Sequence, residues 1–288
     1  MQGMSSTSTP NQITPELRAW IVAQAESGFA PQDVLKAMLG SGWPEEVAME
    51  ALEVTLTEHL QARGQPVPGR QPLPEPALDD SPSSLMVDGH EVKILATMML
   101  PRVVVFGGLL THDECDELVE LSRKRLVRSE TVVNETGGSE VNYARTSDGM
   151  FFERGEHPVC ARIEQRIATL LNWPVNHGEG LQVLRYRPGA EYKPHHDYFD
   201  PIHPGTPTIL SRGGQRVGTL VMYLNTPTKG GATTFPDVGL EVAPAKGNAV
   251  FFSYHMAHAC TKTLHGGAPV IEGEKWVATK WLRERVFN

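Results

Sequence analysis

Apolar residues recur at helical spacing at the start of the chain. Leu17, Ile21 and Ala25 stand four positions apart, behind a Thr14-Pro15 pair that suits the first turn of a helix. Gly and Pro interrupt the pattern twice, so it predicts three short helices, over residues 15–26, 31–39 and 44–62. We therefore expect a small helical module spanning residues 1–63.

A Pro-rich stretch with few bulky apolar residues follows the helices. Residues 64–84 read GQPVPGRQPLPEPALDDSPSS. Such a composition favours an extended, semi-rigid segment over a packed element. The sequence predicts a linker here and a second domain over residues 85–288.

The second domain begins with helical patterns and continues with strand-like ones. A capping box at Thr111 to Glu114 opens an amphipathic helix that reaches about Arg125, and residues 158–171 form a second helical pattern. Short β-rich segments separated by Gly, Pro and Asn occupy residues 102–106, 181–186, 217–224, 240–242, 249–254 and 275–283. Many short strands at this spacing predict an antiparallel sandwich or barrel, and the fold class is α+β.

Composition and charge narrow the class of protein. The 288 residues are 40% hydrophobic and 21% charged, which excludes a disordered or collagen-like chain. A net charge of -8 with no Lys/Arg block argues against a nucleic-acid partner, and no apolar run approaches the roughly 18 residues of a membrane span. The N-terminus shows no secretory pattern, so we expect a cytoplasmic protein. Cys115, Cys160 and Cys260 are widely spaced, and we expect buried free thiols.

The candidate chemistry begins in the segment YKPHHDYF at residues 192–199. If this segment is a strand, His195 and Asp197 point to the same face and can reach one metal ion. A third ligand is needed, and the residues alone leave four downstream candidates, His203, His255, His258 and His265. Two histidines and one carboxylate with open positions favour non-haem Fe(II), which activates dioxygen.

Six spaced motifs occur in order around this pair. They are LQV at 181–183, YKPHHD at 192–197, RVGT at 216–219, GGATTFP at 230–236, LHG at 264–266 and GEKWVATKW at 273–281. Together with RTS at 145–147, they resemble the catalytic domain of the prolyl 4-hydroxylases, within the 2-oxoglutarate- and Fe(II)-dependent dioxygenases. The resemblance implies a double-stranded β-helix (jelly roll) core with flanking helices.

The resemblance also implies the cofactor ligands. It implies that His195, Asp197 and His265 bind Fe(II) and that Lys275 receives the distal carboxylate of 2-oxoglutarate, with hydroxyls from Tyr186 and Thr219. Strand alternation independently places four residues on one face, Lys275, Val277, Thr279 and Trp281. That placement favours an inward-facing lysine over a solvated one.

For the substrate, the resemblance implies a proline-containing peptide or protein that is hydroxylated at C4. The resemblance also implies that dioxygen is consumed, that 2-oxoglutarate becomes succinate, and that ascorbate acts as a reductant. Tyr192 and Trp281 are the expected aromatic walls for the proline ring, and Arg145 contacts the peptide or braces the site. Two alternatives stay open: a hydroxylase of a free amino acid or small molecule with the same cofactors, and a non-catalytic sandwich that binds a ligand.

The N-terminal module has a separate resemblance. Gly28-Phe29-Ala30 and Gly42-Trp43-Pro44, with the helices around them, resemble a ubiquitin-associated-type three-helix domain. We expect this module to bind a protein partner, and the alternative is a generic helical extension.

Overall fold

The computed structural model describes residues 13–63, 72–132, 138–141 and 144–288. The chain divides into two compact units, Met1–Arg70 and Gln71–Asn288. No helix of the described residues has the length and apolar character that crossing a membrane requires.

The first unit is built from the three predicted helices, α1 (Pro15–Glu26), α2 (Pro31–Gly40) and α3 (Glu45–Ala62). The Thr14 hydroxyl accepts a hydrogen bond from the Leu17 amide at 3.3 Å, as its capping position predicts. The helices bury an apolar core of their own, made of Leu17, Ile21, Val34, Met38, Ala48, Ala51 and Leu52. This part of the sequence therefore packs locally.

The second unit begins inside the Pro-rich stretch. Leu73 and Leu78 pack against the core of this unit, and the Glu75 amide donates to the Leu171 carbonyl at 2.8 Å. The C-terminal half of the predicted linker therefore lies along the larger unit.

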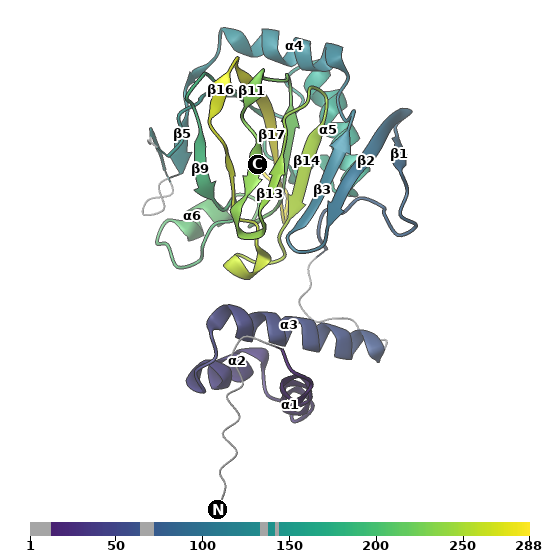
Figure 1. Cartoon of the computed structure of the whole chain (residues 1–288), viewed down its shortest axis with the longest axis vertical. Coiled ribbons are helices and arrows are strands. Elements are labelled where there is room, and N and C mark those ends of the chain that lie inside the picture. The colour runs from purple at the N-terminus through teal and green to yellow at the C-terminus, as the bar shows by residue number, and fades with distance from the viewer. Residues whose placement is uncertain (1–12, 64–71, 133–137, 142–143) are drawn as a thin grey trace, which may run out of the picture. The chain divides into compact units, whose positions relative to one another are not determined.

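A nine-stranded antiparallel sheet forms the centre of the larger unit (Figure 1). In spatial order its strands are β1 (Ser84–Val87), β2 (His90–Met98), β3 (Arg102–Gly107), β14 (Ala249–Ser253), β10 (Arg216–Tyr223), β17 (Lys275–Arg283), β8 (Gln182–Tyr186), β7 (Asp148–Phe151) and β4 (Val127–Arg128). The helices α4 (His112–Arg123) and α5 (Pro158–Leu171) cover one face, where Leu118 and Ile163 join the core with Leu220 and Ala278. All residues of β17 are buried, because both faces of this strand are covered.

A four-stranded sheet packs against the opposite face. Its order is β13 (Leu240–Val242), β12 (Thr233–Phe235), β15 (His265–Gly267) and β9 (Tyr192–His195). Phe235 and Val242 of this sheet share a second core with Phe252 and Val277 of the large sheet. The candidate metal ligands lie at this interface between the two sheets.

The remaining elements are short. Two-stranded sheets pair β5 (Glu130–Val132) with β6 (Ser139–Val141) and β11 (Lys229–Gly230) with β16 (Val270–Glu272). A one-turn helix, α6, covers Thr206–Leu210, and 3-10 turns cover Val175–His177, Pro236–Val238 and Ala259–Thr261.

The mixed α and β composition with antiparallel sheets confirms the predicted class at this level. Helices α4 and α5 and strands β3, β8, β10, β13, β14 and β17 lie where the sequence pattern predicts them. The three cysteines are buried and form no disulfide among the described residues, as expected, and burial raises the pKa of the Cys115 thiol to about 12.

Candidate active site

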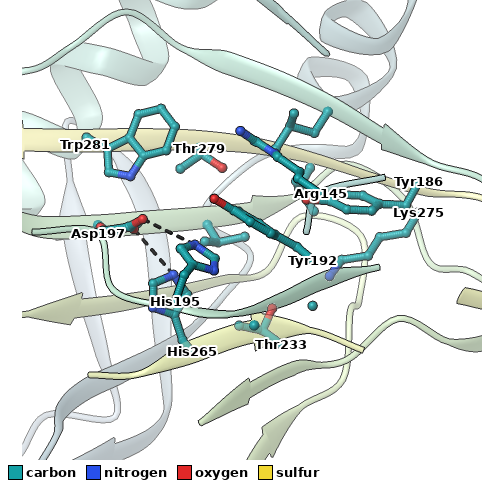
Figure 2. A pocket seen from close by; sticks show the side chains of 16 residues that line it. Arg145, Tyr186, Tyr192, His195, Asp197, Thr233, His265, Lys275, Thr279 and Trp281 are labelled. Carbon is teal, nitrogen blue, oxygen red and sulfur yellow. Dashed lines mark hydrogen bonds and ion pairs between the residues drawn. The ribbon is translucent and has the colours of Figure 1, made fainter. Parts of the chain in front are cut away.

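Two histidines and an aspartate meet between the two sheets. His195, Asp197 and His265 each offer one ligand atom, and these atoms lie within 4.8 Å of one another. His195 Nε2 is 3.5 Å from Asp197 Oδ1, and His265 Nε2 is 3.4 Å from Asp197 Oδ2 (Figure 2). Within the part of the chain that the structure describes, no other His, Cys, Asp or Glu residues form such a group.

The two histidines come together through strand pairing. His265 of β15 is the register partner of His195 of β9. Gly266 allows this close pairing, because a Cβ at that position would lie 2.9 Å from the Tyr192 carbonyl oxygen. The glycine after His265 therefore permits a close backbone approach, as its sequence context predicts.

Asp197 reaches the site in a different way from the predicted one. Strand β9 ends at His195, so Asp197 lies beyond the strand and strand alternation does not apply to it. The carboxylate still faces both imidazoles because the chain bends after His195. The prediction that the pair can reach one metal ion is consistent with this geometry, but its premise of a continuous strand is wrong.

Hydrogen bonds orient all three candidate ligands. His195 Nδ1 lies 2.8 Å from the Lys193 carbonyl oxygen, and His265 Nδ1 lies 2.9 Å from the Thr263 carbonyl oxygen. Each Nδ1–H can donate to its carbonyl, which leaves Nε2 as an acceptor that points at Asp197. The Thr219 hydroxyl donates to Asp197 Oδ2 at 2.7 Å. Such outer contacts are typical of a metal site with preset ligand orientations.

The protonation states suit a cation. Burial lowers the pKa of His195, and the adjacent His265 lowers it further, which favours the neutral imidazole that a metal ion needs as a ligand. Burial opposes ionisation of Asp197, but His265 and His195 outweigh it and hold the pKa of this carboxyl well below its usual range. Two imidazoles and one carboxylate are a donor set that fits Fe(II).

A buried lysine lies in the same pocket. Lys275 is 4% exposed, and no described carboxylate pairs with its ammonium group. Its Nζ faces the rings of Tyr186 at 5.5 Å and Tyr223 at 5.8 Å. Burial lowers its pKa to about 8. A buried cation without a counter-ion is costly, so this position fits an anionic ligand.

Strand β17 presents the lysine as its alternation predicts. The pocket that holds the three candidate ligands is also lined by Lys275, Val277, Thr279 and Trp281. Trp276 and Ala278 point to the opposite, helix-covered core. Figure 2 shows Lys275 reaching into the pocket beside Tyr192.

The two predicted hydroxyl donors lie in different surroundings. Tyr186 is the register partner of Lys275, and its ring lies against the ammonium group. The Thr219 hydroxyl bonds to Asp197 and lies 3.1 Å from the Tyr254 hydroxyl. Thr219 therefore contacts the candidate metal ligand rather than the lysine.

Thr233 lines the pocket and has no predicted role. It is buried, and its hydroxyl accepts a hydrogen bond from Tyr223 at 2.8 Å. The signal that could have found it is the GGATTFP motif at 230–236, whose threonines follow a glycine pair.

The aromatic residues predicted to contact substrate lie at the pocket mouth. The Tyr192 ring stacks on His195 with centroids 3.6 Å apart, and the Arg145 Cζ lies 4.9 Å from the centroid of the Tyr192 ring. Figure 2 shows Tyr192 between these groups, with Trp281 across the pocket. Trp281 Nε1 is buried without a hydrogen-bond partner among the described residues.

Arg145 is a second buried cation. It is 4% exposed and donates to Gln182 Oε1 at 2.7 Å, while its Nε has no described partner. The guanidinium lines both the inner pocket and a wider cleft outside it.

The wider cleft has a volume of about 780 Å³ and meets the inner pocket at five shared residues, Arg145, Tyr192, His195, Asp197 and Trp281. The other three histidine candidates, His203, His255 and His258, take no part in the ligand group. The site therefore consists of a buried chamber with a cation at its end and an open cleft above the candidate ligands.

Comparisons with known proteins identify relatives of this chain. A family model described as the 2OG-Fe(II) oxygenase superfamily matches residues 181–283. The chain is 39% identical over 235 residues to prolyl 4-hydroxylase 2 of Arabidopsis thaliana, covering 73% of this chain and 76% of that protein. It is 40% identical over 232 residues to probable prolyl 4-hydroxylase 4 of the same plant, covering 72% and 75%. Among solved structures, the viral collagen prolyl hydroxylase of Paramecium Bursaria Chlorella virus-1 is 31% identical and covers 63% of this chain and 95% of that one, with a TM-score of 0.48.

Proposed function

The chain belongs to the prolyl 4-hydroxylase family of 2OG-Fe(II) oxygenases, and on this premise we propose that it hydroxylates prolyl residues at C4 in a peptide or protein. The reaction consumes dioxygen and 2-oxoglutarate and releases succinate and carbon dioxide. The observation that carries the proposal is the pairing, in one pocket, of a complete His-Asp-His donor set with an unpaired buried lysine.

We assign the cofactor ligands from this geometry. His195, Asp197 and His265 would hold Fe(II), and the bound ion would supply the oxidising chemistry together with dioxygen and 2-oxoglutarate. The Lys275 ammonium binds the distal carboxylate of 2-oxoglutarate, and the Tyr186 ring encloses that end of the chamber. Lys275 and Arg145 make the chamber positive, which suits a dianion.

Thr219 has a positioning role in this proposal. Its hydroxyl donates to Asp197 Oδ2, so it holds the carboxylate toward both imidazoles. This replaces the role in 2-oxoglutarate binding that the resemblance implies for Thr219.

The substrate enters from the cleft above the candidate metal ligands. Tyr192 and Trp281 form aromatic walls for a proline ring at the point where cleft and chamber meet, and Arg145 braces Tyr192. A cleft of about 780 Å³ is larger than a free proline needs and favours a peptide. The two sheets around the site form the double-stranded β-helix in this proposal. Ascorbate would serve as the reductant that keeps the metal in the Fe(II) state.

The test is mass spectrometry of a proline-containing peptide incubated with the full chain, Fe(II), 2-oxoglutarate and ascorbate. We expect one added oxygen on proline and an equal amount of succinate. A reaction on free proline that exceeds the reaction on peptide would move the assignment to a small-molecule hydroxylase. Absence of iron-dependent succinate formation with any peptide would contradict the proposal.

We further propose that the N-terminal helices form a separate all-α module that binds a protein partner. Its core is its own, and it exposes Trp20, Phe29 and Leu39. Once a partner protein has been identified, a variant of the full chain that combines Phe29→Ser with Leu39→Ser should bind it less tightly and leave turnover on a free peptide unchanged. If this variant binds the partner as tightly as the unmodified chain does, the proposed role is wrong.

A further inference from the structure

The cleft above the candidate metal ligands is positively charged, although the chain carries a net charge of -8. Its lining includes five cationic side chains, Arg125, Arg128, Arg145, Lys193 and Arg216. Asp197 is the one carboxylate among the lining residues that the structure describes, and it belongs to the candidate metal site. The cleft thus differs in sign from the molecule as a whole.

Two of these cations are already paired. Arg216 donates to Glu179 at 2.7 Å, and Arg125 donates to Glu156 at 2.6 Å. The other three, Arg128, Arg145 and Lys193, have no carboxylate partner among the described side chains. Arg145 is buried with an unpartnered Nε, so this guanidinium retains unused hydrogen-bonding capacity inside the cleft.

The unpaired cations lie on both sides of the cleft. Arg128 is on the edge strand β4, and Lys193 is on β9 of the small sheet, and both side chains are exposed. The backbone ties Lys193 to the Arg145 segment, since its amide donates to the Ala144 carbonyl at 2.9 Å. Charges from two different sheets therefore face one shared opening.

Apolar side chains accompany these charges. Phe151 is 51% exposed and Val127 is 68% exposed, and both line the cleft. The Phe151 ring lies 6.4 Å from the Trp281 ring. An apolar strip beside unpaired cations fits a peptide that carries carboxylates near an apolar residue.

We propose that this cleft selects proline-containing peptides in which aspartate or glutamate residues flank the target proline. The inference rests on the proposed prolyl hydroxylation and adds a charge preference to it. Arg128 and Lys193 are the specificity-determining residues at the cleft rim, and Arg145 supplies the buried positive charge. Because the rim charges are exposed, they attract the peptide mainly during encounter, and the preference depends on salt.

The first experiment compares three peptides that differ only beside the proline, where they carry Glu, Gln or Lys. At low salt we expect kcat/KM for the Glu peptide to exceed that for the Gln peptide by about tenfold, mostly through KM, with the Lys peptide lowest. Raising the ionic strength to about 0.5 M should shrink the difference to about twofold, because the Debye length falls to a few Å.

The second experiment reverses the rim charge with Arg128→Glu and Lys193→Glu together. We expect the double variant to lose the preference for the Glu peptide and to gain one for the Lys peptide, with unchanged KM for 2-oxoglutarate. Lys93→Glu is the control for a charge reversal outside the cleft, since Lys93 is exposed on β2, near the edge of the large sheet opposite Arg128. This control should keep the preference of the unmodified chain.

The outcomes separate the inference from the function on which it rests. Equal kcat/KM for the Glu and Gln peptides, or a preference that survives the double reversal, overturns the charge selection and leaves prolyl hydroxylation standing. If none of the three peptides gains an oxygen, the proposed function fails as well.

Discussion

Two buried lysines on strand β17 face opposite sides of the large sheet. Lys280 is 1% exposed on the helix-covered side, and its ammonium donates to Glu164 Oε1 at 2.5 Å. Lys275 is 4% exposed on the side of the candidate site and has no described carboxylate partner. The fold supplies a carboxylate that neutralises Lys280, whereas it leaves the ammonium group of Lys275 available to an anionic ligand.

The partners of Glu164 complete this contrast. Its second oxygen accepts a hydrogen bond from the Gly155 amide at 2.8 Å, so the ion pair with Lys280 is fully enclosed. Burial lowers the pKa of both lysines, but for Lys280 the Glu164 carboxylate opposes this effect. A buried lysine is therefore evidence for a binding site only when its counter-ion is missing.

The largest effect is expected when a candidate metal ligand is removed from the pocket that also holds Lys275. His195→Ala removes one of the three candidate metal ligands. Because a bound metal ion lowers the reaction barrier by several kcal/mol, we expect turnover to fall by about a thousandfold or more. The melting temperature should change little. Steady-state succinate formation and Fe(II) titration by calorimetry measure the two effects, and turnover close to that of the unmodified chain would refute the metal assignment.

Replacing each of the two lysines by methionine should have different effects on 2-oxoglutarate binding and on stability. Lys275→Met should raise KM for 2-oxoglutarate by about a hundredfold, the cost of removing one partner of a buried ion pair, without loss of stability. Lys280→Met leaves Glu164 buried and unpaired, which should destabilise the fold by about 3 kcal/mol without changing that KM in the folded fraction.

Urea unfolding and 2-oxoglutarate kinetics on both variants provide the measurement. If Lys280→Met changes KM as much as Lys275→Met does, the distinction between the two faces is wrong.

A smaller effect is expected where the large sheet supports the metal ligand. Thr219→Val removes the hydroxyl that donates to Asp197 but keeps a side chain of similar shape. We expect about a thirtyfold loss of Fe(II) affinity, in the range typical of residues that orient metal ligands. KM for 2-oxoglutarate at saturating Fe(II) should stay nearly constant, and a large rise in it would instead support direct contact between Thr219 and 2-oxoglutarate.

The smallest effect is a pH dependence. The pKa of Lys275 is lowered by burial to about 8, and an anionic ligand binds its protonated form. Affinity for 2-oxoglutarate should therefore be constant below pH 8 and fall by up to about tenfold per pH unit above it. In Lys275→Arg this fall should disappear, because arginine stays protonated, and an unchanged pH profile would show that another group is responsible.

Local sequence patterns predicted the long elements well. Helices α1 to α5 carry their apolar spacing within one segment, and α1, α4 and α5 also have side-chain N-caps. Strand β17 carries its alternation over nine residues, Lys275–Arg283. The sequence patterns do not predict the hairpin of β1 and β2 or the short strands β7 and β12. They are short, half-exposed or interrupted by Gly and Pro, so they form because the neighbouring strands supply hydrogen bonds.

The candidate site divides in the same way. His195 and Asp197 are two residues apart, and their proximity can be anticipated from the sequence. The residues alone did not distinguish His265 from His203, His255 and His258, which the family resemblance did. The bend that carries Asp197 past the end of β9 depends on packing and was missed.

The sequence by itself determined which side chains are available: two histidines and an aspartate with spare lone pairs, and a lysine on a defined face of a strand. Tertiary structure decided what each of them meets. The register of β15 on β9 sets His265 opposite His195, and the large sheet brings the Thr219 hydroxyl to Asp197. The same packing gives Lys280 a carboxylate and Lys275 none. The sequence of a strand determines which of its side chains are charged. Whether a charged side chain is neutralised depends on residues that only the fold brings near, as Glu164 is brought to Lys280 from more than a hundred positions away.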